Sequence, residues 1–66
     1  MALDHARAES KAQYHAYQER ARQLAASVNR VMDREVVEVG ASPTVWEVEE
    51  GAFVEAVIWV PKAAHP

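Results

Sequence analysis

The hydrophobic pattern of the chain changes its period once, near Arg34, and this change constrains the fold more than any other feature. Before it, residues 4–33 contain neither glycine nor proline and are rich in alanine, arginine, glutamine and glutamate, all good helix formers. After it, apolar residues, many of them β-branched or aromatic, alternate with glutamates in three runs, EVVEV, TVWEVE and AFVEAVIWV. Such alternation is typical of strands. The sequence therefore predicts an α+β fold with one long N-terminal helix.

The expected helix is amphipathic, because its apolar residues recur at steps of three and four. This stripe comprises Tyr14, Tyr17, Ala21, Leu24, Val28 and Val31. The opposite, solvent-facing side carries Gln13, Arg20, Gln23, Ser27 and Arg30. Two starts are consistent with the pattern: Asp4 as an N-cap, or Ser10 in a capping box with Gln13. The stripe weakens before Tyr14, so residues 1–9 are interpreted as a helix start that frays.

Two connectors set the expected order of the strands. The segment GASP, residues 40–43, would join the first two strands, and residues 49–51 would form a three-residue hairpin loop with Gly51 in the left-handed region. Val48 would then face Ala52. A two-residue Glu50-Gly51 turn is disfavoured because it would place Glu55 on the apolar face. These choices predict a three-stranded antiparallel meander beneath the helix (α-β-β-β), in one domain of residues 1–66 with a C-terminal tail at 61–66.

This register divides the strands into two faces. One face would pack beneath the helix stripe. The core would then contain the helix residues Tyr17, Ala21, Leu24, Val28 and Val31 and the strand residues Val37, Val39, Trp46, Val48, Val54, Ile58 and Val60. The opposite face mixes carboxylates with large apolar side chains, and aromatic residues often anchor interfaces. We interpret it, together with the turn, as a candidate partner-binding surface: Val36, Glu38, Val45, Glu47, Glu49, Phe53, Glu55, Val57 and Trp59.

Size and charge narrow the function classes. The chain has 66 residues and no cysteine, and domains this small often need oligomerisation for stability. The net charge is −3, and the acidic excess lies wholly after residue 32. The longest apolar run is too short for a membrane span, so the chain is expected to be complete and cytoplasmic. Its alanine- and arginine-rich usage suggests a GC-rich bacterial genome or a phage of such a host.

No motif for catalysis, phosphate binding or metal binding is present, so we expect neither an enzyme nor a cofactor. His5 with Glu9, and His15 with Glu19, have helical i,i+4 spacing, but two ligands do not make a structural metal site. Nucleic-acid binding is disfavoured, because the aromatic face is acidic and would repel phosphates. A basic helix arm with Arg7, Lys11, Arg20 and Arg22 remains as a DNA-binding alternative. No membrane or small-molecule partner is expected.

The leading functional hypothesis is a small acidic protein–protein interaction module. Its acidic, aromatic face would meet a basic site on another protein, and an inhibitor from a phage or mobile element that mimics nucleic acid is a special case. A structural homo-oligomer is the first alternative. It would form a homodimer through the sheet face or through strand 52–60, which has an unpaired edge in a meander. A DNA-binding regulator is the second alternative.

Overall fold

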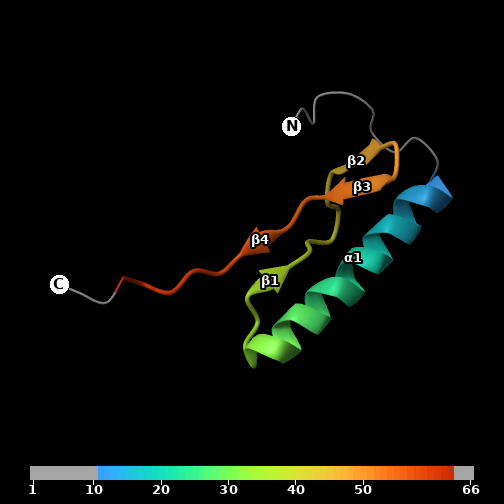
Figure 1. Ribbon diagram of the computed structural model, residues 1–66. Helices are drawn as coiled ribbons and strands as arrows, with labels where there is room; N and C mark the ends of the chain where they lie inside the picture. Colours follow the sequence, from blue (N-terminus) through green and yellow to red (C-terminus); the bar gives the residue numbers. More distant parts are fainter. Residues whose placement is uncertain (1–10, 64–66) are drawn as a thin grey trace.

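The computed structural model describes residues 11–63 and confirms the α+β class. Helix α1 spans Lys11–Met32 and is followed by four short strands, β1 (Val37–Glu38), β2 (Val45–Val48), β3 (Gly51–Val54) and β4 (Val57–Ile58) (Figure 1). Both expected helix starts and the expected frayed segment 1–9 lie outside the described residues, as do residues 64–66 of the tail.

The three-stranded meander is not confirmed, because β1 and β2 do not pair with each other. Both pair antiparallel with the C-terminal part of the chain, β1 with β4 and β2 with β3. The four strands thus form two small two-stranded sheets, which follow each other along residues 36–48 and 51–59 as one long ribbon, and α1 runs along it (Figure 1). The segment GASP does not reverse the chain. It bulges out of one strand, since Val37 pairs with Ile58 and Val45 pairs with Val54, leaving four unmatched residues between them.

The turn of the ribbon also differs from the expected one. Val48 pairs with Gly51, so the loop contains only Glu49 and Glu50, and Gly51 does not have a positive φ. The expected pairing of Val48 with Ala52 is therefore wrong by one residue. A shift of one residue moves every side chain of a strand to the opposite face.

The shift exchanges the two faces of β2. Val45, expected on the outer face, is 2% exposed, making it the most deeply buried apolar residue in the described chain. Trp46, expected in the core, pairs with Phe53 on the side of the ribbon away from the helix. Pairing with Ala52 likewise places Glu47 on the inner face with Val45.

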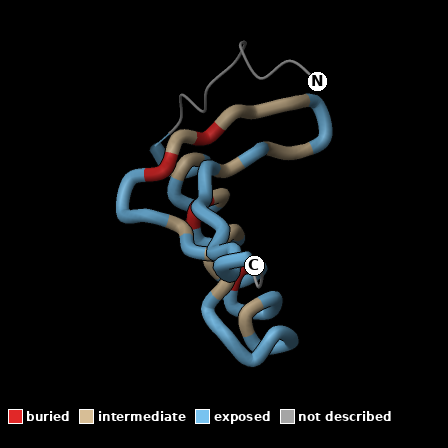
Figure 2. Tube along the Cα trace, turned by 90° about the vertical axis from the view of Figure 1, so that its left-hand side faces the viewer, coloured by how far each residue is buried: buried red, intermediate tan, exposed pale blue. Residues whose placement is uncertain are grey.

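Burial is sparse throughout the described residues (Figure 2). Among residues 11–63, only Gln18, Ala25, Pro43 and Val45 are buried. Several residues that the sequence places in the core are exposed instead: Leu24, Val28, Val31, Ile58 and Val60. The rest of the expected core is half-buried: Tyr17, Ala21, Val37, Val39, Trp46, Val48 and Val54. A single copy thus leaves much of its apolar stripe in water.

The helix ends in a Schellman motif. Arg34 N–H donates to the Asn29 carbonyl at 3.1 Å, and Asp33 N–H donates to the Arg30 carbonyl at 3.2 Å. Asp33 occupies the left-handed position with φ of 55°, where glycine is the usual residue. A side chain with a Cβ is strained there, and a carboxylate near the helix C-terminus is disfavoured by the helix dipole.

Replacing Asp33 by glycine is therefore expected to stabilise the protein by about 1 kcal/mol, raising Tm by roughly 4–8 °C. Thermal unfolding followed by circular dichroism measures the change. Asp33→Asn, which removes the charge but keeps a side chain, is the matched control and should give a smaller gain. A lower Tm for Asp33→Gly would contradict this account of the helix end.

Candidate protein-interaction site

Helix α1 packs against one edge of the ribbon through a row of polar side chains. Four of them reach backbone groups of residues 36–43. Tyr14 donates to the Pro43 carbonyl at 2.7 Å, Gln18 to Ala41 at 2.8 Å and Arg22 to Gly40 at 2.8 Å. Asn29 completes the row at the other end of the helix. We call Tyr14, Gln18, Arg22 and Asn29 the capping row.

Asn29 makes three bonds to the edge of β1. Its Oδ1 accepts from Val36 N–H at 2.7 Å and from Val37 N–H at 2.9 Å, and its Nδ2 donates to the Val37 carbonyl at 3.0 Å. The side-chain amide therefore replaces the neighbouring strand that β1 lacks on this side. The capping row closes the part of this edge formed by β1 and residues 40–43, which would otherwise present unpaired backbone groups.

The other edge of the ribbon is open. Glu55 N–H donates to the Thr44 carbonyl and Trp59 N–H donates to the Val36 carbonyl, both at 2.8 Å. Along an antiparallel strand, residues that bond to the paired strand alternate with residues that do not. Odd-numbered residues such as Glu55 and Trp59 therefore bond to the paired strand, and the even-numbered residues between them point their backbone groups away from it. We call these outward groups the free edge: Ala52, Val54, Ala56, Ile58 and Val60. Within residues 11–63, no hydrogen bond outside the two ladders involves them.

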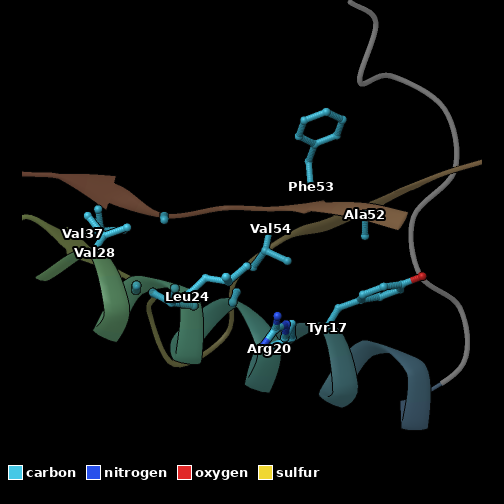
Figure 3. A pocket seen from close by; sticks show the side chains of 12 residues that line it. Tyr17, Arg20, Leu24, Val28, Val37, Ala52, Phe53 and Val54 are labelled. Carbon is cyan, nitrogen blue, oxygen red and sulfur yellow. The ribbon is translucent and has the colours of Figure 1, made fainter. Parts of the chain in front are cut away.

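An apolar groove of about 320 Å³ separates the helix stripe from the inner face of the ribbon. Tyr17, Leu24 and Val28 line it from the helix, while Ala52 and Val54 face them from the ribbon (Figure 3). Ala56, a residue of the free edge, also lines it. Leu24 is 52% exposed at this groove, so the inner face is an incompletely covered core rather than a ligand cavity.

The outer face of the ribbon combines exposed apolar and acidic side chains. Phe53 is 40% exposed and points away from the helix (Figure 3). Val57 and Glu38 pair across the ribbon on this face, and both are exposed. No described residue forms a side-chain hydrogen bond or ion pair with Glu38 or with Glu49 in the turn. We call Glu38, Glu49, Phe53 and Val57 the outer patch.

Two other residues of the expected surface have partners within the chain. Arg34 lies over the Trp59 ring, with its Cζ 3.7 Å from the ring centroid, a distance typical of a cation–π contact. The Glu55 carboxylate accepts from Thr44 N–H at 3.0 Å and so closes the ladder beside the bulge. Trp59 and Glu55 therefore contribute to the fold as well as to the surface.

The nine expected surface residues are thus only partly brought together. Val36, Glu38, Phe53, Glu55, Val57 and Trp59 share the outer face by strand parity, and Glu49 lies in the adjoining turn. Val45 and Glu47 lie on the inner face. The capping row was not predicted, although its steps of four, four and seven residues follow the helical repeat and place its side chains on one side of the helix.

The described residues give little support to other types of site. No group of three or more His, Cys, Asp or Glu residues within 11–63 could hold a metal ion. Of the basic arm, Arg7 lies outside the described residues, and Arg22 belongs to the capping row. The helix of the described part, α1, is not apolar enough over a sufficient length to cross a membrane.

Comparisons with known proteins do not assign a family. No protein-family model matches the chain, and no significant match is found among curated proteins or solved structures. The function is therefore inferred from the geometry of the chain itself.

Proposed function

We propose that this chain is a non-enzymatic protein-interaction module that binds a basic surface of another protein through its outer patch. The observation that carries the proposal is the exposure of Phe53 and Val57 on the same ribbon face as the carboxylate of Glu38, which has no side-chain partner among residues 11–63. Glutamates of the ribbon surround this face, whereas most basic residues lie on the helix. A basic protein would gain both charge complementarity and an aromatic anchor there.

The two kinds of residue would contribute differently to binding. Carboxylates mainly speed encounter and select a basic partner, while a buried aromatic side chain supplies most of the affinity. Phe53 is the better anchor, because Arg34 already covers a face of Trp59. Carboxylates spaced along a ribbon can also occupy phosphate positions, so inhibition of a nucleic-acid-handling protein in the cytoplasm of a bacterial host is a special case of this proposal.

Replacing Phe53 by alanine is expected to weaken this binding by about 30-fold or more, the loss typical of an interface anchor. The tagged protein is used to purify a partner from its source cells, and the affinity of that partner is then measured by calorimetry. Glu38→Lys combined with Glu49→Lys should also weaken binding and flatten its salt dependence. Gln23→Ala, on the exposed side of the helix, is the control. A partner that binds all four proteins equally would refute the proposal.

A further inference from the structure

We propose that a second copy of this chain pairs with the free edge and completes the apolar groove. The two copies are related by a two-fold axis that passes through Ala56 and is perpendicular to the ribbon. This inference concerns the free edge and the inner face and does not rest on binding by the outer patch, although Phe53 of that patch would lie opposite Trp59 of the second copy. The occupant of the edge is a second copy of this chain. Self-association is also one of the alternatives suggested by the small size of the chain.

Within residues 11–63, the two edges of the ribbon differ in how far their backbone groups are covered. The edge formed by β1 and the bulge is closed by the capping row through hydrogen bonds of Tyr14, Gln18, Arg22 and Asn29. The opposite edge has a long run of outward N–H and C=O groups and mostly apolar side chains. Such an edge is a template for pairing with another strand. Added strands commonly bind by this backbone ladder.

The sequence of residues 52–60, AFVEAVIWV, is self-complementary about Ala56. In an antiparallel pair centred there, Val54 of one copy faces Ile58 of the other, and Phe53 faces Trp59. Aliphatic and aromatic cross-strand pairs of this kind stabilise sheets. Ala52 faces Val60, and the small Ala56 meets its own copy at the axis. Glu55 faces Val57 on the outer face, and every residue from 52 to 60 has a cross-strand partner, as an isologous interface requires.

Neighbouring positions of the axis are less favourable. An axis at Glu55 would place two carboxylates directly opposite each other, which is destabilising. An axis at Val57 would shorten the ladder and set Phe53 opposite Pro61. An axis at Ala56 also suits the backbone, because the N–H and C=O groups of this residue point outward and can bond to the second copy.

This arrangement covers the groove as well as the edge. A two-fold axis perpendicular to the sheet keeps both helices on the same face, so a four-stranded antiparallel sheet would carry two helices. The grooves of the two copies would join at Ala56, which lines each of them. Leu24 and Val28, exposed in a single copy, would then lie over a common apolar face.

A single introduced cysteine tests the axis directly, because the chain has no cysteine of its own. Opposite residues of a hydrogen-bonded antiparallel pair have Cα atoms about 5.5 Å apart, which is within the range for a disulfide. Ala56→Cys is therefore expected to form a covalent dimer on mild oxidation. Ala52→Cys is the control, because its two copies would lie roughly 26 Å apart at about 3.3 Å per residue. The double variant Ala52→Cys with Val60→Cys should cross-link again.

Each result decides the proposal. At least tenfold more covalent dimer from Ala56→Cys than from Ala52→Cys supports it, provided that light scattering gives the unmodified chain a dimer mass. A mass of 7.4 kDa for the unmodified chain overturns self-pairing, as would a different protein occupying the edge. Equal cross-linking of both variants overturns the axis. If the chain is monomeric but still loses a basic partner on Phe53→Ala, only the self-pairing is wrong and the proposed function stands.

Discussion

Replacing Asn29 by alanine is expected to lower the free energy of unfolding by about 2–4 kcal/mol. The substitution removes three hydrogen bonds at once, to Val36 N–H, Val37 N–H and the Val37 carbonyl. Each part-buried backbone group that loses its partner costs roughly 1–3 kcal/mol, less where water can replace the bond. Small domains are only marginally stable, so a loss of this size would populate the unfolded chain. Urea titration at one fixed protein concentration measures it.

Two controls separate the amide from the helix itself. Asn29→Asp keeps the oxygen that accepts from Val36 and Val37 but sets a carboxylate oxygen against the Val37 carbonyl, so we expect an intermediate loss. Arg30→Ala changes the next, exposed residue and should alter stability by less than about 0.5 kcal/mol. If Asn29→Ala were as mild as Arg30→Ala, the capping row would not be what holds the ribbon to the helix.

Replacing Leu24 by glutamate is expected to raise the dissociation constant of the dimer by about 100-fold or more. Leu24 is 52% exposed within one copy, so the substitution should perturb the subunit little. In the dimer the same position lies over the joined inner faces, where an unpaired carboxylate is costly to bury. A 100-fold change corresponds to about 2.7 kcal/mol. Sedimentation velocity over a range of concentrations measures the dissociation constant.

Gln23→Glu is the matched control for this prediction. It introduces the same residue one position earlier, on the exposed side of the helix, and removes no apolar contact. We expect it to leave the dissociation constant within about threefold of the unmodified value, since exposed charges interact weakly. Equal dissociation constants for Leu24→Glu and the unmodified chain would show that the groove is not part of the contact.

The sequence predicted the helix well because its period is repeated over many residues. The helix ends at Met32, close to the expected end, and all five residues of the expected solvent-facing side are exposed. The expected packing of the helix was less accurate. Gln18 and Asn29 were not assigned a role, because a polar side chain that caps a strand edge has the same sequence pattern as one that faces water.

The order and register of the strands could not be derived from local signals. The segment GASP contains glycine and proline and reads as a turn, yet the chain continues through it as a bulge. Gly51 likewise favours a left-handed loop position, but it pairs with Val48 instead. The free energy contributed by a preferred turn conformation is a fraction of the free energy gained by burying Val45. Packing therefore selects the register.

The alternation of side chains along each strand explains which residues of the outer face the sequence predicted correctly. Residues of the C-terminal strand keep their expected side, so Phe53 and Val57 are exposed as the alternation indicates. Only β2 is inverted, which moves Val45 and Glu47 inward and brings Trp46 beside Phe53. A one-residue change at the turn therefore altered the composition of the surface without removing its aromatic and acidic character.

Sedimentation equilibrium of the unmodified chain shows whether a second copy pairs with the free edge and covers the inner face. We expect a mass of twice 7.4 kDa at micromolar and higher concentrations. A stable mass of 7.4 kDa at all concentrations, combined with cooperative unfolding that does not depend on concentration, would contradict it.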